Sequence, residues 1–346
     1  MRKLFDSTLK DGKVTGVYIT SDRRELEERL SSLSSFVIVT DENTSSCSPF
    51  PEKTLVLESG ECNKTPESLG RIISYALSLG LGRDGTFVAL GGGVVCDMTA
   101  LAASLYMRGA GLILCPTTLL CMVDATLGGK TAVDYEKTKN LVGTFYPASE
   151  VIIPVYTLST LPESEYMSGM GEVVKHALLS DSNDLYDLLM NEKEKILSRD
   201  EDTVIRLLEL SLLVKKSYIE RDPEEKMGIR SFLNFGHTFG HALESVTDYG
   251  VSHGEAVVWG MKKALTAGLL LGITPEDFYL WSVNLISSYP FENIPKIKKA
   301  DYDRFLDAVK KDKKKNGGRT RFVFLTERGE PVLRTLEDEQ ILALII

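Results

Sequence analysis

The sequence predicts an α/β domain of Rossmann-like type at residues 1–158 and a mainly α-helical domain at residues 159–346. The length of 346 residues is typical of two domains. In the first half, short β-rich apolar runs alternate with helical segments, a pattern typical of a parallel α/β sheet. Helical periodicity dominates the second half. A connection bracketed by Pro154 and Pro162 indicates the boundary.

Each predicted element is an apolar run of suitable length and period. Four runs in the first half are short enough for buried strands: residues 36–40, 53–57, 87–90 and 112–115. The segment 94–106 follows the third of these strands and is predicted to be a helix. In the second half, residues 201–216 and 256–271 repeat apolar side chains at helical spacing.

The composition describes a globular protein and argues against several classes. Hydrophobic residues make up 43% of the chain and charged residues 26%. A net charge of −9 and a pI near 5.2 argue against nucleic-acid binding, which needs a broad basic face. Five cysteines without a C-x-x-C spacing support neither a disulfide framework nor a thiolate zinc site. No signal-peptide core or run of roughly 18 apolar residues is present, so a cytoplasmic protein without membrane contact is expected.

A glycine triplet at residues 91–93 follows the strand predicted at 87–90 and opens a predicted helix. Backbone amides at such a turn can approach a phosphate, which favours a dinucleotide pyrophosphate as ligand. Asp41 and Asn43, which follow the strand at 36–40, would suit a ribose. The triplet lacks the G-x-G-x-x-G spacing, so a purely structural role for this glycine turn is an alternative that stays open. For Asp41 and Asn43, the alternative is a turn followed by a helix cap.

The tetrapeptide Gly-Gly-Lys-Thr at residues 128–131 matches the end of a P-loop. The first glycine of that motif would fall at position 124, which is Asp124, and a carboxylate is not tolerated there. A P-loop is therefore rejected. Lys130 can still bind a phosphate monoester or an enolate as a point charge.

Three separate segments of the second half offer metal ligands. Glu172, His237 and His253 would together leave one tetrahedral position of a Zn²⁺ ion open, which is typical of a catalytic metal. His241 lies four residues after His237 on the same helical face, so by spacing it is also a candidate ligand. A lone histidine is more often a hydrogen-bonded core residue. The combination of Glu172, His237 and His253 instead indicates a catalytic metal site, and so an enzyme.

In order and spacing, the motifs of this chain resemble those of the 3-dehydroquinate synthase family over nearly its whole length. Seven segments carry the resemblance, and together they are far more specific than any one of them. They are Gly-Gly-Gly-Val-x-x-Asp at 91–97, Tyr-Met-Arg-Gly at 106–109, Pro-Thr-Thr-Leu-Leu at 116–120, the segment 124–131, Gly-Glu-Val-Val-Lys at 171–175, Leu-Asn-Phe-Gly-His-Thr-Phe-Gly-His at 233–241 and His-Gly-Glu-Ala-Val at 253–257.

The resemblance implies an NAD-binding N-terminal domain and a metal- and substrate-binding C-terminal domain. It implies Glu172, His237 and His253 as ligands of Zn²⁺ or Co²⁺, and assigns His241 to an anionic group of the substrate. His176 is expected to be structural. For the nucleotide, the family positions are Asp41, Asn43, Glu61, Lys64, Gly92, Gly93, Asp97, Thr117, Thr118, Lys130, Lys139 and Thr160.

The family's reaction closes a phosphorylated keto acid, 3-deoxy-D-arabino-heptulosonate 7-phosphate, to 3-dehydroquinate. NAD⁺ oxidises a ring carbinol, phosphate leaves by elimination, the hydride returns, and ring opening precedes an aldol closure. The carboxylate and phosphate of this substrate need cations and hydrogen-bonding partners. The resemblance nominates Asp124, Lys130, Lys139, Asn140, Lys175, Lys216, Arg230, Asn234, His241 and Lys313, with Arg108 reaching the phosphate from the neighbouring subunit of a homodimer.

The chain departs from the family pattern at a few positions. Cys96 stands where a glycine is usual, which would affect helix packing but not the phosphate-facing glycines. Lys313 lies in a lysine run, which is more often a solvated face than a site. The segment 222–230 is one residue longer than the family's. Glu225 would therefore need a local shift to take the place of the acidic residue expected four positions before Arg230.

Other functions stay open at this point. A cyclase that forms 2-deoxy-scyllo-inosose or a valiolone would act on a substrate without the carboxylate, whereas Lys216, Arg230 and His241 favour a substrate that has one. A polyol dehydrogenase of the glycerol dehydrogenase type shares the glycine turn and the two domains, but it would release NADH. A non-enzymatic binding protein would not need an open metal site beside a nucleotide.

Overall fold

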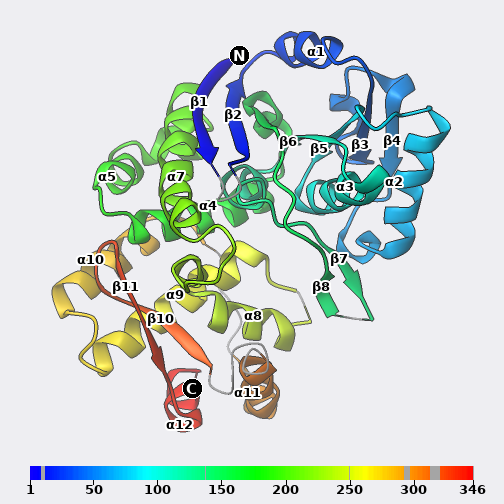
Figure 1. Ribbon diagram of the computed structural model, residues 1–346. Helices are drawn as coiled ribbons and strands as arrows, with labels where there is room; N and C mark the ends of the chain where they lie inside the picture. The colour runs from blue at the N-terminus through cyan, green and yellow to red at the C-terminus, as the bar shows by residue number, and fades with distance from the viewer. Residues whose placement is uncertain (9–11, 137, 249, 292–296, 312–319, 346) are drawn as a thin grey trace. The chain divides into compact units, whose positions relative to one another are not determined.

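The computed structural model describes residues 1–8, 12–136, 138–248, 250–291, 297–311 and 320–345. It divides into two compact units, Met1–Leu161 and Pro162–Ile346, a little after the boundary expected at residue 158. The first unit is α/β and the second mainly α-helical (Figure 1), which confirms the predicted fold class. None of the described helices is both long and apolar enough to cross a bilayer.

A seven-stranded sheet in the order β1-β2-β9-β6-β5-β3-β4 forms the centre of the first unit. Neighbouring strands are parallel except β1 and β2, which pair antiparallel. The four strands predicted from apolar runs are confirmed as β3, β4, β5 and β6. The strands are β1 (Arg2–Thr8), β2 (Val14–Thr20), β3 (Phe36–Asp41), β4 (Thr54–Leu57), β5 (Thr86–Gly91), β6 (Gly111–Pro116) and β9 (Glu150–Pro154).

Three strands of this sheet, β1, β2 and β9, were not predicted. β9 lies between β2 and β6, and its Val151 pairs with Val17 on one side and Leu114 on the other. Both partners are distant in sequence, so a short apolar run at 150–154 becomes a central strand only through long-range pairing.

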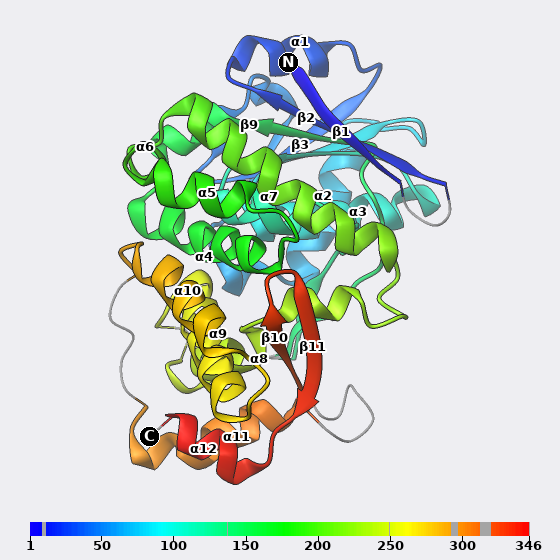
Figure 2. The same ribbon diagram turned by 90° about the vertical axis from the view of Figure 1, so that its left-hand side faces the viewer.

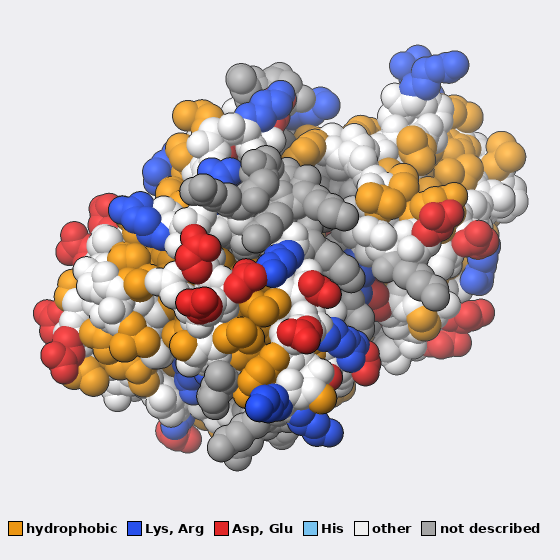
Figure 3. Space-filling view, turned by 90° about the horizontal axis from the view of Figure 1, so that it is seen from below, with side chains coloured by type: hydrophobic (Ala, Val, Ile, Leu, Met, Phe, Trp, Pro, Cys, Tyr) orange, Lys and Arg blue, Asp and Glu red, His pale blue; other side chains and the backbone are white. Residues whose placement is uncertain are grey.

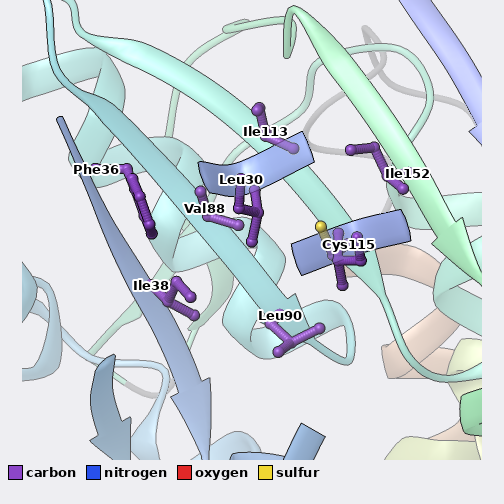
Figure 4. Close-up of a cluster of buried hydrophobic side chains, with 9 residues drawn as sticks. Leu30, Phe36, Ile38, Val88, Leu90, Ile113, Cys115 and Ile152 are labelled. Atoms are coloured by element: carbon purple, nitrogen blue, oxygen red, sulfur yellow. The ribbon is translucent and has the colours of Figure 1, made fainter. Parts of the chain in front are cut away.

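Helices α1 (Arg23–Ser31), α2 (Pro66–Ser78) and α3 (Gly93–Leu105) complete the first unit. Leu30 of α1 packs with Ile38, Val88, Ile113 and Ile152 of four strands (Figure 4). Full burial of each such side chain contributes roughly 1.5–3 kcal/mol. This cluster fixes the strands whose carboxyl ends carry the predicted nucleotide residues.

Shorter elements connect these strands. β7 (Val133–Tyr135) and β8 (Thr138–Val142) form a separate antiparallel hairpin. The helical turns are η1 (Ser45–Cys47), η2 (Pro51–Lys53), η3 (Glu61–Asn63), η4 (Tyr106–Arg108), η5 (Cys121–Ala125) and η6 (Val155–Thr160).

The second unit is built on helices, and the two predicted at 201–216 and 256–271 are confirmed as α7 and α9. A hairpin of β10 (Arg321–Glu327) and β11 (Glu330–Thr335) was not predicted; β10 packs on α9 (Figure 2). The other elements are α4 (Glu163–Leu179), α5 (Asp184–Asn191), α6 (Lys193–Leu197), α7 (Glu201–Arg221), η7 (Arg230–Asn234), α8 (His237–Val246), α9 (His253–Leu270), α10 (Glu276–Ser287), η8 (Lys299–Asp301), α11 (Tyr302–Lys311) and α12 (Asp338–Ile345).

Acidic and basic side chains are interspersed on the face shown in Figure 3. Hydrophobic side chains gather in several groups on the same face.

Candidate active site

Lys64 is a buried lysine that joins three segments of the first unit. Its Nζ atom donates to Oδ2 of Asp97 and to Oδ1 of Asn140, both at 2.6 Å. Its carbonyl oxygen accepts from the amide of Asp134, whose carboxylate in turn accepts from the amide of Asn140. Burial raises the pKa of Asp97, although the Lys64 ammonium opposes the shift. This network ties the β7–β8 hairpin to α3 and to the segment before α2.

The glycine triplet lies where the sequence predicts it. Gly91 ends β5, Gly92 is the N-cap of α3, and Gly93 begins the helix. The amide of Thr117 donates to the carbonyl of Gly91, and a Cβ at Gly92 would lie 3.3 Å from the Thr118 methyl. The first amides of a helix have no intrahelical partner, so this turn can receive an anionic group.

Cys96 lies on the buried side of α3. Its Sγ atom is 3.6 Å from Sγ of Cys121, and both side chains are almost fully buried. The departure from glycine therefore fills space between α3 and η5. Gly92 and Gly93 lie at the start of the same helix.

Several predicted nucleotide residues have local partners. Oδ1 of Asp41 accepts from the amide and hydroxyl of Thr44, so this carboxylate caps a turn. Glu61 lies 3.6 Å from the Lys139 ammonium. Asn43 is exposed, and Thr160 donates to the carbonyl of Thr157.

Arg108 belongs to a strained turn. Met107 and Arg108 have φ angles of 47° and 67°, a region that costs energy for residues other than glycine. Both side chains are exposed. The sequence Tyr-Met-Arg-Gly thus presents an arginine at the surface of the first unit. Asp124 in η5 is half-buried, and Lys130, which follows it, is exposed.

Donor atoms of Glu172, His237 and His253 meet in the second unit, although the residues come from α4, α8 and α9. The Nε2 atoms of His237 and His253 lie 3.4 and 3.7 Å from Oε1 of Glu172. Ligand atoms about 2.1 Å from a tetrahedral metal lie about 3.4 Å apart, so this spacing fits Zn²⁺. Among the described residues, Oε1 of Glu172 is buried without a hydrogen-bond partner, as an atom facing a metal would be.

Lys175 places a positive charge beside this cluster. Its buried ammonium contacts the other carboxylate oxygen of Glu172, Oε2. Burial opposes ionisation of Glu172, but Lys175 and the imidazoles hold its pKa well below the usual value. Burial, and then Lys175, lowers the pKa of His237, which favours the neutral imidazole that binds metals. Burial lowers the pKa of His253, but Glu172 and Glu244 outweigh it and raise the pKa to about 10.

Glycines allow the three helices to approach closely. A Cβ at Gly254 of α9 would lie 1.8 Å from the carbonyl oxygen of Ser168 in α4. A Cβ at Gly260 would lie 2.0 Å from the carbonyl oxygen of Gly236, just before α8. Side chains at these crossings would push apart the helices that carry the candidate metal ligands.

Each imidazole also has a partner at its second nitrogen. Nδ1 of His237 lies 3.3 Å from the carbonyl oxygen of Phe235, and Nδ1 of His253 lies 3.3 Å from Oε1 of Glu244. The sequence analysis did not select Glu244. A signal was available, because Glu244 follows His237 by two helical turns and so shares its face.

Other predicted residues surround this cluster or lie elsewhere in the unit. The rings of His237 and His241 are 5.3 Å apart, and His241 is exposed. His176 is buried, and its Nδ1 atom lies 2.7 Å from Oγ of Ser211. Lys216 pairs with Glu220 at 2.7 Å. Asn234, at the end of η7, is exposed, and Lys313 lies outside the described residues.

The loop before Arg230 turns back on itself. Glu225 and Gly228 have φ angles of 59° and 80°. The carboxylate of Asp222, missed by the sequence analysis, accepts from the amides of Lys226, Met227 and Arg230 at 2.8–3.1 Å. Glu225 lies half-buried on this loop.

Family models described as the N-terminal and C-terminal parts of 3-dehydroquinate synthase match residues 54–168 and 169–315. The 3-dehydroquinate synthase of Acetivibrio thermocellus is 35% identical, with 95% of each chain covered. That of Prochlorococcus marinus is 40% identical over 83% of this chain and 79% of its own.

The chain belongs to the 3-dehydroquinate synthase family. The resemblance on which the sequence analysis relied is therefore confirmed, and with it the assignment to an enzyme family. The 3-dehydroquinate synthase family membership also accounts for the order of the seven motifs along the chain.

Solved structures with the same fold include enzymes other than 3-dehydroquinate synthases. A 2-deoxy-scyllo-inosose synthase in complex with carbaglucose-6-phosphate, NAD⁺ and Co²⁺ has a TM-score of 0.84 at 24% identity, covering 99% of this chain and 98% of its own. A 2-epi-5-epi-valiolone synthase of Streptomyces hygroscopicus, with NAD⁺ and Zn²⁺ bound, has a TM-score of 0.82 at 24% identity, covering 95% of each chain. At this identity the likeness concerns the fold alone.

Proposed function

We propose that this chain converts 3-deoxy-D-arabino-heptulosonate 7-phosphate to 3-dehydroquinate and phosphate. The observation that carries the proposal is the convergence of Glu172, His237 and His253 in a chain 35–40% identical to curated 3-dehydroquinate synthases. A cyclase that makes an inosose or a valiolone is supported only by fold likeness at lower identity.

The proposed cofactors are Zn²⁺ or Co²⁺ and NAD⁺. The metal ion would be held by Glu172, His237 and His253 and would supply Lewis-acid polarisation of substrate oxygens. NAD⁺ would supply reversible hydride acceptance, with its pyrophosphate at Gly92 and Gly93. The other proposed nucleotide contacts are Asp41, Asn43, Glu61, Lys64, Asp97, Thr117, Thr118, Lys130, Lys139 and Thr160.

The remaining residues bind and orient the substrate. The buried ammonium of Lys175 would stabilise negative charge that develops beside the metal ligands. Arg230, Lys216 and His241 would hold the substrate carboxylate, and Arg230 is well suited because it is buried and fixed by its loop. The other proposed substrate contacts are Asp124, Lys130, Lys139, Asn140, Asn234 and Lys313.

Arg108 is proposed to act on the substrate phosphate of a neighbouring subunit. The strained backbone at Met107 and Arg108 supports a functional role, because such conformations cost roughly 1–3 kcal/mol each. The proposal therefore includes a homodimer. Light scattering of the purified chain tests the dimer, and mixing Arg108→Ala with a second inactive variant tests whether subunits share sites.

The function is tested by incubating the protein with the heptulosonate phosphate, NAD⁺ and Zn²⁺. Release of inorganic phosphate without accumulating NADH is expected, because the hydride returns within each turnover. Accumulating NADH would point instead to a polyol dehydrogenase. Phosphate release from glucose 6-phosphate, but not from the keto acid, would point to a cyclase for substrates without a carboxylate.

A further inference from the structure

Glu244 is a largely buried carboxylate on the last turns of α8. Its Oε1 atom lies 3.3 Å from Nδ1 of His253, which is the first residue of α9. Its side chain is 12% exposed, so this contact is only partly screened by water.

The contact determines which nitrogen of His253 can face a metal. An ionised carboxylate only accepts hydrogen bonds, so Nδ1 must carry the proton that points to Glu244. Nε2 is then the nitrogen that can release its proton and present a lone pair to a metal ion, and it is the atom 3.7 Å from Oε1 of Glu172. His237 has the same arrangement, with the carbonyl of Phe235 in place of the carboxylate.

His253 depends on this partner more than His237 does. Its side chain is 29% exposed, against 11% for His237. The start of α9 is fixed by the capping box of Ser252 and Glu255 and by Gly254 against Ser168. These contacts hold the backbone but do not involve the imidazole ring. Among the described residues, Glu244 is the partner in contact with Nδ1 of this ring.

We propose that Glu244 is a positioning residue for the metal centre. It fixes the ring orientation and tautomer of His253 and strengthens Nε2 as a donor to a divalent metal. Acidic partners of this kind typically change metal affinity by about 10- to 100-fold. The inference rests on the metal site of the proposed function, but it concerns affinity for the metal and not the reaction.

A second arrangement of the same residues makes a different prediction. Donor atoms of His241, Glu244 and His253 also lie within 4.8 Å of one another. If Glu244 were itself a ligand, Nδ1 of His253 would face a second metal ion. The protein would then bind two equivalents. Glu172, His237 and His253 are the more buried set, which favours a single ion there.

The test compares Glu244→Ala, Glu244→Gln and Glu255→Gln with the unaltered protein. The Zn²⁺ dissociation constant and stoichiometry are measured by competition with a chromophoric chelator, and metal-free variants are melted by circular dichroism. Glu244→Ala should weaken Zn²⁺ binding about 10- to 100-fold at a stoichiometry of one. Glu244→Gln should lose less, because its amide oxygen can still accept. Glu255→Gln, which keeps the capping box but does not touch the ring, should bind like the unaltered protein.

Each other outcome has a definite meaning. Unchanged affinity in Glu244→Ala would overturn the proposal, and so would loss of one of two bound equivalents. An equal loss of Zn²⁺ affinity in Glu255→Gln would show that the effect comes from a change in the local fold. A lower melting temperature of metal-free Glu244→Ala would show the same, and either result would overturn the proposal. Failure of the unaltered protein to bind Zn²⁺ would instead overturn the metal site of the proposed function.

Discussion

Gly254 faces Ser168 so closely that a Cβ atom on Gly254 would lie 1.8 Å from the Ser168 carbonyl oxygen. The amide of Gly254 also donates to the Ser168 hydroxyl at 3.1 Å. This contact joins α9 to α4, and the neighbours of these two residues along each helix include His253 and Glu172. The packing of these two helices therefore also sets the spacing of His253 and Glu172, two of the three proposed metal ligands.

Gly254→Ala should destabilise the protein, because the obstacle is backbone and cannot move aside as a side chain would. A loss of about 1–3 kcal/mol or more in the free energy of unfolding is expected, with weaker Zn²⁺ binding. Gly70→Ala is the matched control: Gly70 lies on an exposed face of α2 with nothing near its Cβ position, so this change should stabilise by about 0.5–1 kcal/mol. Urea denaturation measures both. Equal stability of the two variants would contradict the close approach.

His237→Ala should lose Zn²⁺, because two remaining protein ligands cannot hold the ion against water. Elemental analysis after dialysis measures the metal content. His241→Ala is the control, since its ring is close but is assigned to the substrate, and it should retain stoichiometric zinc. Zinc retained by His237→Ala would remove His237 from the ligand set.

Arg230→Ala and Lys216→Ala should weaken substrate binding and spare NAD⁺. A charge-assisted hydrogen bond to a carboxylate is worth about 1.5–3 kcal/mol, which corresponds to roughly 10- to 150-fold in affinity. Calorimetry with a non-reactive carbocyclic phosphonate analogue and with NAD⁺ separates the two ligands. Equal losses for both ligands would show that these residues act through folding.

Asp222→Asn should destabilise the loop before Arg230 in a pH-dependent way. Burial raises the pKa of Asp222, but hydrogen bonds from backbone amides outweigh it and hold the pKa below its usual value. Because the folded pKa lies below the unfolded one, the stabilisation is complete above the unfolded value near 3.8 and is lost as the pH falls through the folded value. The unaltered protein should therefore exceed the variant by about 1.5–3 kcal/mol at pH 7, and the difference should shrink below about pH 4.

Glu27→Gln serves as the control for that experiment, because Glu27 is exposed on α1. Its effect should stay within about 0.5 kcal/mol at every pH. Denaturation curves at several pH values give the comparison. A difference for Asp222→Asn that grows as the pH falls would have the wrong sign for a carboxylate with a lowered pKa.

The sequence by itself determined the family, the fold class and the elements whose signals are local. β3 to β6 are apolar runs of strand length, and α7 and α9 repeat apolar residues at helical spacing. The glycine triplet follows a strand and opens α3, as its position in the sequence predicts. The sequence also nominated Glu172, His237 and His253 as metal ligands, from their residue types and the family resemblance, because zinc is bound by only a few kinds of side chain.

The remaining strand pairings and side-chain contacts were decided only by the tertiary structure. β9 is central because it pairs with strands distant in sequence, and the hairpin of β10 and β11 packs against α9. The hydrophobic periodicity of a short segment predicts neither of these relationships. The partners of the second imidazole nitrogens, Glu244 and the Phe235 carbonyl, depend on where helix ends meet. The carboxylate of Asp222 accepts hydrogen bonds from the amides of Lys226 and Arg230, which approach it only because the loop turns back. In each case the deciding contact joins groups that approach only after the chain has folded, since hydrogen bonds and packing depend on distance and direction in space.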